Sequence, residues 1–183
     1  MEQDRVIEPV AISAYSSISA CGAGIAALHF GLVENVSKLR PLKLFEIPFN
    51  TKVGQIQEVL PDIDVSLKLY DSRNAQVALA ALNHPQEHVR STLAEAISIY
   101  GNKRIGVIIG TSTSGLYETE SAYAEFLVTQ SMPEDFHFVT RHAYQATARY
   151  LQLELGVTGP CYAISTACSS SAKAIAAGQR LIV

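Results

Sequence analysis

Residues 164–172 read Ile-Ser-Thr-Ala-Cys-Ser-Ser-Ser-Ala and join an apolar stretch to a helix-forming one. The apolar stretch, residues 160–164, follows a Gly-Pro turn and predicts a short buried strand. Residues 172–182 are rich in alanine and carry isoleucine and leucine, so they predict a buried helix. The sequence therefore predicts a strand, a tight turn that carries Cys168, and a helix.

Cys168 lies within a residue or two of the start of this predicted helix. The backbone N–H groups at a helix N-terminus are unpaired and the helix dipole is positive there, which favours thiolate over thiol. Small neighbours leave room for a substrate carbonyl, and the same N–H groups would stabilise the oxyanion formed when a thioester is attacked. The alternative is that Cys168 is a buried packing residue, as most free cysteines are.

The segment 164–172, preceded by Gly-Val-Thr-Gly-Pro at 156–160, resembles the active-site segment of β-ketoacyl-acyl carrier protein synthases. These are condensing enzymes of the thiolase fold. The resemblance covers essentially the whole chain and implies that Cys168 is the catalytic nucleophile. It also implies that residues 1–183 form one domain, the N-terminal half of a thiolase-like α/β fold with a mainly parallel sheet flanked by helices. On this interpretation the chain ends within the helix after the nucleophile.

The same resemblance implies three further site residues. Thr113 falls at the position whose size helps limit the length of the acyl chain, and Phe138 would reach toward the acyl pocket. Lys68 matches a basic residue that docks the acidic carrier protein, more clearly than Arg73 does. Each of these two cations, taken singly, is also typical of a solvated helix end.

The implied partners are acyl carrier protein and either a second copy of the chain or a C-terminal half; no cofactor is implied. In a family dimer, the strand before Cys168 pairs across the interface. The second half of the family fold carries two histidines that assist decarboxylation of the malonyl group. None of the five histidines of this chain occupies either position. We therefore expect the isolated chain to be inactive, or badly impaired, in the complete condensation.

Two other hypotheses stay open at this point. The chain could be a non-catalytic fragment that self-associates or binds a partner, because half of a paired fold exposes a large apolar face. It could also be a thiolase that uses coenzyme A, which shares the fold and the nucleophilic cysteine. The sequence of residues 166–170, Thr-Ala-Cys-Ser-Ser, resembles the carrier-protein synthases more than the thiolases.

The composition of the chain limits its size class, its partners and its compartment. The chain has 183 residues, 48% of them hydrophobic, which is enough for one sizeable core. A net charge of -3 argues against a nucleic-acid binder. Three cysteines without an export signal predict reduced thiols in a cytoplasmic protein. No apolar run reaches the roughly 18 residues of a transmembrane helix.

Hydrophobic spacing predicts the other elements, in an order typical of an α/β fold. Either Asp71 or Ser72 is expected to cap the helix predicted over 67–82. The remaining predicted elements are a first strand over 6–19, a short strand over 53–56, a buried strand over 104–110, and helices over 25–36, 67–82, 87–100, 117–129 and 143–155.

Three patterns suggest ligand sites without completing them. His84 and His88 have helical spacing, but no third metal ligand lies nearby at a suitable spacing, so no metal site is predicted. Residues 21–24 lack the three-glycine fingerprint of a dinucleotide-binding loop. Residues 110–116 lack the lysine of a phosphate-binding loop. The last two are interpreted as connections between strands and helices.

Overall fold

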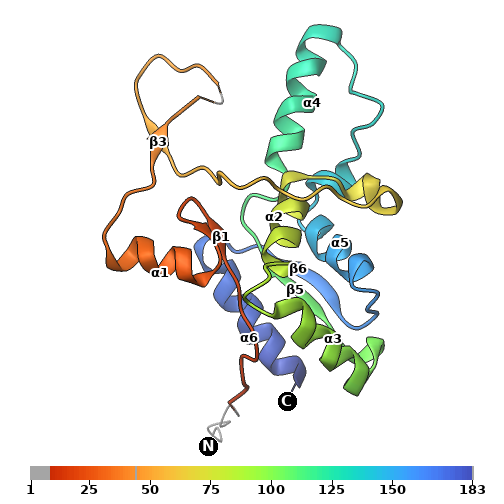
Figure 1. The fold of residues 1–183 in the computed structure, drawn as a ribbon. Coiled ribbons are helices and arrows are strands. Elements are labelled where there is room, and N and C mark those ends of the chain that lie inside the picture. The colour runs from red at the N-terminus through yellow and green to blue at the C-terminus, as the bar shows by residue number, and fades with distance from the viewer. Residues whose placement is uncertain (1–8, 44, 183) are drawn as a thin grey trace, which may run out of the picture.

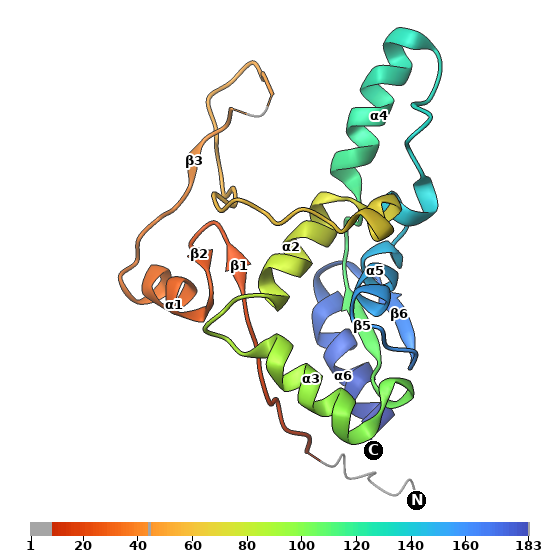
Figure 2. The ribbon, with the colours of Figure 1, turned by 45° about the vertical axis from the view of Figure 1, so that its right-hand side comes forward.

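A computed structural model describes residues 9–43 and 45–182, and its centre is a pair of parallel strands. Strand β5 (Val107–Gly110) pairs with β6 (Cys161–Ile164), with Val107 opposite Cys161 and Gly110 opposite Ile164. Helices α5 (Ala146–Glu154) and α6 (Ser170–Ile182) lie on opposite sides of this pair (Figures 1 and 2). This arrangement confirms the predicted α/β class and the strand-turn-helix around Cys168.

Alternate residues of β5 face the two helices. Val107 is buried in a cluster with Ala148 of α5 and with Val157. The next residue, Ile108, faces α6, where a Cβ on Gly178 would lie 3.8 Å from its Cδ1 atom. The continuous apolar run therefore serves a strand covered on both faces, as the sequence predicted.

A second core cluster forms beneath the predicted helix over 67–82. That segment is divided into a 3-10 helix, η1 (Val65–Tyr70), and helix α2 (Arg73–Leu82). Ser72 caps α2, its Oγ accepting a hydrogen bond from the Ala75 N–H at 3.2 Å. The buried members of the cluster are Ile63, Ala75, Leu79 and Tyr150.

The other helices agree with the predicted ones to within a few residues at their ends. Helix α4 (Leu116–Thr129) projects away from the strand pair, and the chain returns through a π-helix, η3 (Phe138–His142), that the sequence did not predict (Figure 1). No helix in the described residues is long and apolar enough to cross a membrane. Other helices of the described residues are α1 (Ile25–Val33), α3 (Val89–Tyr100) and the 3-10 helix η2 (Asn102–Arg104).

The strands at the start of the chain differ from the prediction. Within residues 9–19 of the predicted first strand, only β1 (Ile18–Ser19) forms, as a hairpin with β2 (Gly22–Ala23); residues 1–8 lie outside the described part. The short strand, expected at 53–56, is β4 (Lys52–Val53), antiparallel to β3 (Arg40–Pro41). One of the three described strand pairs is parallel, so the parallel sheet is narrower than expected. A β-prone run forms a strand only beside a partner, and no described strand lies along residues 9–17.

Tyr150 gives this core a measurable dependence on pH. Its side chain is 0% exposed, and its hydroxyl has no hydrogen-bond partner among the described residues. Burial, with the Glu154 carboxylate as the next cause, raises the pKa of Tyr150 to about 12. An unfolded tyrosine ionises near pH 10, so the folded state binds more protons than the unfolded state between pH 10 and 12. Stability contributed by Tyr150 is therefore present below pH 10 and lost as pH rises through 12.

We expect Tyr150→Phe to remove this dependence. At pH 7 the free energy of unfolding should stay equal or rise by about 1 kcal/mol, because an unpartnered buried hydroxyl is removed. Between pH 10 and 12 the wild type should lose up to about 3 kcal/mol more than the variant. Urea unfolding of wild type and variant at pH 7, at pH 10 and at pH 12 measures the difference. Tyr100→Phe, at an exposed tyrosine, is the matched control. Equal alkaline losses in wild type and Tyr150→Phe would contradict the assignment.

Candidate active site

Cys168 lies in a single 3-10 turn, η4 (Ala167–Ser169), between the end of β6 and the start of α6. Its side chain is exposed. The alternative that Cys168 is a buried packing residue is therefore wrong for the described structure. An accessible thiol at a strand-to-helix turn has the placement expected of a nucleophile.

The turn is held by its backbone conformation and by one buried serine. Ala167 has a φ of 51°, in the left-handed region that costs an alanine roughly 1–2 kcal/mol. Ser170, only 3% exposed, accepts a hydrogen bond from the Thr166 N–H at 2.9 Å and donates to the Ala167 carbonyl at 2.8 Å. These two bonds compensate for the strained backbone at Ala167 and fix the path of the chain through Cys168.

The backbone donors beside the thiol are fewer than the sequence suggested. The Ser169 N–H donates to the Thr166 carbonyl at 3.3 Å, and the Ser170 N–H donates to the Ala167 carbonyl. Among the described residues, the Cys168 N–H has no such partner. One amide at this turn is therefore free to donate to an oxyanion formed next to the sulfur.

The carboxyl ends of β5 and β6 bring a second loop to the same edge. Because the strands are parallel, the Thr111 N–H continues the ladder and donates to the Ile164 carbonyl at 3.1 Å. The start of α6 packs directly on Gly110, where a Cβ would lie 2.7 Å from the backbone of Ser170. The loop over residues 111–115 and the Cys168 turn thus both begin at the same edge of the sheet, where the carboxyl ends of β5 and β6 lie.

Partly buried hydrogen bonds hold the loop that carries Thr113. Ser114, with a φ of 56°, is buried, and its Oγ donates to the carbonyl of His142. The Asn74 side chain donates to the Ser114 carbonyl at 2.5 Å. Gly115 lies so close to η3 that a Cβ there would overlap the Arg141 carbonyl. Thr113 itself is exposed at the bend of this fixed loop.

Phe138 lies on the element to which the loop is bound. It begins η3 and stacks on His142, with the ring centroids 4.7 Å apart and the planes at 25°. Its side chain is 57% exposed. The segments of Thr113 and Phe138 are thus joined through Ser114 and His142, and the loop that joins them starts beside the Cys168 turn.

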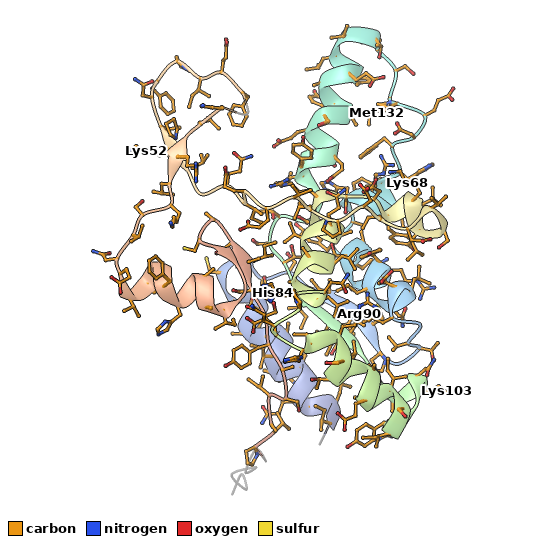
Figure 3. The ribbon with its side chains drawn as sticks, in the orientation of Figure 1. Lys52, Lys68, His84, Arg90, Lys103 and Met132 are labelled. Carbon is orange, nitrogen blue, oxygen red and sulfur yellow. The ribbon has the colours of Figure 1, made fainter. Side chains whose placement is uncertain are left out.

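Lys68 lies outside this group of segments. It is in η1, where its ammonium pairs with the Asp71 carboxylate, and its side chain is 64% exposed (Figure 3). Helix η1 contacts η3 and α5. Lys68 is therefore an exposed residue of an element that contacts η3, and part of its charge is already compensated.

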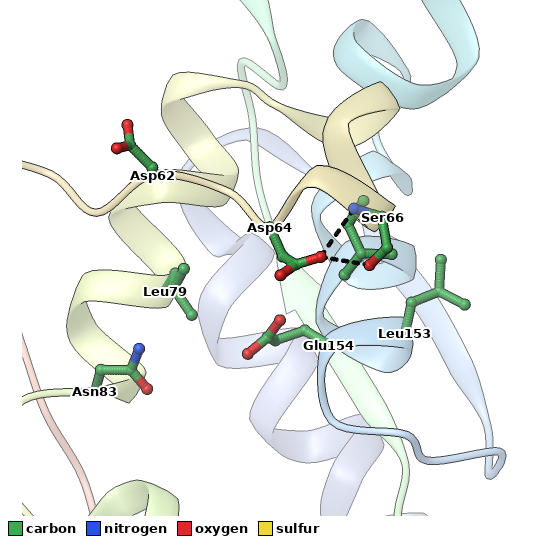
Figure 4. A pocket seen from close by; sticks show the side chains of 8 residues that line it. Asp62, Asp64, Ser66, Leu79, Asn83, Leu153 and Glu154 are labelled. Atoms are coloured by element: carbon green, nitrogen blue, oxygen red, sulfur yellow. Dashed lines mark hydrogen bonds between the residues drawn. The ribbon is translucent and has the colours of Figure 1, made fainter.

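A pocket of about 440 Å³ lies away from the Cys168 turn, between η1, α2 and α5 (Figure 4). Two of its three acidic side chains, Asp64 and Glu154, already have local partners. Hydrogen bonds from the Ser66 hydroxyl and N–H to Asp64 hold the pKa of that carboxyl below its usual value. Glu154 pairs with Arg90 at 2.5 Å. These two carboxylates therefore serve the fold, Asp64 as a helix cap and Glu154 in an ion pair.

The histidine pair noted in the sequence has separate surroundings in the structure. His84 Nδ1 lies 3.9 Å from Glu87 Oε1, and that oxygen accepts a hydrogen bond from the Ile25 N–H at 2.8 Å. His88 precedes α3 with a φ of 55°. Glu87, which lies between the two histidines in the sequence, joins the start of α1 to the connection between α2 and α3.

Sequence patterns gave no indication of Ser170, Thr119 or His142 as parts of the site. Thr119 Oγ1 lies 2.5 Å from His142 Nδ1, although 23 residues separate them. Ser170 belongs to a run of three serines in which nothing local distinguishes the buried one. Only the fold shows that Ser170 is the buried serine and that Thr119 lies beside His142.

The family model described as Beta-ketoacyl synthase, N-terminal domain, matches residues 8–183. The chain is also similar to nodulation protein E of Rhizobium meliloti (strain 1021), with 26% identity over 169 residues. That match takes in 91% of this chain and 41% of the relative, so the chain spans less than half the length of the curated relative.

Solved ketosynthases have the same fold. One chain of the complex of the ketosynthase ApeO with its chain length factor ApeC, from Xenorhabdus doucetiae, is 31% identical with a TM-score of 0.78, over 92% of this chain and 43% of that one. A β-ketoacyl synthase from Burkholderia phymatum STM815 is 22% identical with a TM-score of 0.70, over 93% and 42%. The ishigamide ketosynthase/chain length factor is 16% identical with a TM-score of 0.69, over 94% and 44%.

Proposed function

Because this chain belongs to the β-ketoacyl synthase family through the family's N-terminal domain, we propose that Cys168 is the nucleophile of a decarboxylative condensation. The product would be a β-ketoacyl chain of fatty acid or polyketide-type synthesis. The observation that carries the proposal is the exposed Cys168 thiol beside its own unpaired N–H at the start of α6. A family match to ketosynthases favours this reaction over that of a coenzyme A thiolase.

In the proposed first stage, the Cys168 thiolate attacks the thioester carbonyl of an acyl carrier protein. The Cys168 N–H donates to the oxyanion, and the positive end of α6 favours negative charge there. The carbonyl re-forms as the carrier thiolate leaves and takes up a proton, so the acyl chain is transferred to Cys168. In the second stage, the enolate left when malonyl-carrier protein loses carbon dioxide attacks this acyl group and expels the Cys168 thiolate.

Thr113 and Phe138 are proposed to border the acyl chain. Their segments are joined through the Ser114–His142 hydrogen bond, and the loop starts at the sheet edge that carries Cys168. Phe138 is an exposed aromatic side chain, as a binding surface for an alkyl chain requires. A threonine at position 113 would leave moderate space for the acyl chain.

A protein partner is proposed to cover the apolar surface formed by α4 and η3. Several large apolar side chains of α4 and η3 are exposed, including Tyr117, Val128, Phe138 and Val139. Surfaces of this kind mark protein interfaces. The partner proposed is a second ketosynthase-type subunit or half, as in the solved complexes of a ketosynthase with its chain length factor. The alternative of a purely non-catalytic binding module rests on the same surface and would leave Cys168 unacylated.

Lys68 is proposed to contribute to docking of the acidic carrier protein. Lys68→Ala should have little effect, because Asp71 already compensates part of the charge. Lys68→Glu should slow acylation by an acyl carrier protein about three- to ten-fold, mainly through KM, because charge reversal weakens encounter. Acylation by a small thioester, acyl-N-acetylcysteamine, should stay the same. Lys103→Glu, in η2, is the matched control, and equal slowing by both reversals would contradict a specific docking role.

The test of the proposed function is the mass of the intact protein after incubation with a medium-chain acyl carrier protein. A gain of one acyl group, located on Cys168 by fragmentation of the peptide, supports the proposal. Soluble, folded protein that gains no acyl mass, alone or with a supplied ketosynthase-type partner, would overturn it.

A further inference from the structure

His142 connects three elements around the proposed acyl site. Its ring stacks on Phe138 within η3, a π-helix closed by the hydrogen bond from the Ala143 N–H to the Phe138 carbonyl at 2.9 Å. Its Nδ1 atom lies 2.5 Å from the Thr119 hydroxyl of α4. Its carbonyl accepts hydrogen bonds from Ser114 Oγ and from the Gly115 N–H.

The position of one hydrogen on His142 follows from counting donors. The Thr119 hydroxyl has a single hydrogen, and it donates to the Gly115 carbonyl at 3.0 Å. The same oxygen can then contact His142 Nδ1 only by accepting. His142 therefore carries a hydrogen on Nδ1, and the bond to Thr119 fixes the plane of its ring.

The fixed ring in turn fixes Phe138. Stacking at 4.7 Å with planes at 25° restricts the Phe138 ring, which has no other ring partner among the described residues. The carbonyl of the same histidine holds the loop on which Thr113 lies. One residue thus sets both side chains proposed to border the acyl chain.

We propose that His142 is a positioning residue that sets the acyl-chain preference by orienting Phe138 against the 111–115 loop. The inference rests on the proposed function. It predicts a change in preference between acyl chains, whereas loss of a merely structural residue would slow acylation by all chains in proportion.

The two interactions of His142 can be removed separately. His142→Asn keeps a donor near the Nδ1 position and removes the ring, whereas His142→Phe keeps a ring and removes the donor. The readout is the ratio of short-chain to medium-chain acyl groups on Cys168 when both acyl carrier proteins compete. We expect His142→Asn, which loses the ring, to shift the ratio about five-fold or more. His142→Phe can still stack on Phe138 but is no longer held by Thr119, so its shift should be smaller, about two-fold. The exposed His137→Ala is the control. Equal ratios in wild type and His142→Asn, or an equal shift in His142→Phe, would overturn the inference.

The hydrogen-bond geometry has its own readout, which does not depend on acylation. The ¹⁵N spectrum of the histidine ring should show His142 with its hydrogen on Nδ1, and Thr119→Val should remove this preference. A His142 signal that Thr119→Val leaves unchanged would overturn the inference, because Thr119 would then not hold the ring. A wild type that is never acylated would overturn the proposed function and the selectivity with it, while this spectrum would still decide whether Thr119 fixes the ring.

Discussion

Replacing Cys168 with alanine is expected to abolish acyl transfer to the protein completely. The sulfur is the atom to which the acyl group is bonded in the proposed reaction, so no residual route remains. The replacement should leave the fold intact, because the Cys168 side chain is exposed and the turn is held by Ser170 and the backbone. Intact mass after incubation with acyl carrier protein measures the loss, and urea unfolding confirms that the variant is folded.

The chain supplies two internal controls for this result. Cys161 lies in β6, where burial raises the pKa of its thiol, with the Arg149 charge acting in the opposite direction. Cys161→Ala should therefore retain the acyl mass gain, since a thiol that ionises less readily is the poorer nucleophile. Cys21→Ala should retain it as well. A mass gain that survives Cys168→Ala and vanishes in Cys161→Ala would contradict the assignment of the nucleophile.

The sequence predicted those parts of the site that depend on neighbouring residues. The turn at Cys168 was predicted from an apolar run, small residues and a helix-forming run, all within residues 160–182. The strand over β5 was predicted in the same way. Asp71 and Ser72 were the two predicted helix caps, and in the structure Ser72 caps α2. Local patterns of this kind carry enough information to place an element along the chain.

Features that depend on partners distant in the sequence could not be predicted. A β-prone run over 6–19 gave no information on whether a strand would lie beside it. The break between η1 and α2 was hidden because Asp64 and Ser72 are both good caps, and the structure uses both. The bond between Thr119 and His142 depends on how α4 meets η3 in space, to which no periodicity in the sequence corresponds.

Gly110→Ala is expected to displace the start of α6 and impair both stability and acylation. A Cβ on Gly110 would lie 2.7 Å from three backbone atoms of Ser170 and Ser171, which cannot rotate away as a side chain would. The helix would have to shift, at a cost of about 3 kcal/mol in the free energy of unfolding. Because Cys168 precedes this helix, acylation in the remaining folded protein should fall about 100-fold, the effect of roughly 1 Å of misplacement.

Gly178→Ala separates this effect from the mere addition of a methyl group to the same interface. Gly178 lies in the same helix and also faces β5, but a Cβ there would lie 3.8 Å from Ile108, an ordinary contact. Alanine in a helix interior should stabilise the protein by about 0.5–1 kcal/mol and leave acylation unchanged. If Gly110→Ala and Gly178→Ala unfold at the same urea concentration, α6 does not rest on Gly110. In that case its N-terminus would not be held beside Cys168, and the stabilising role assigned to it in the first stage would have to come from elsewhere.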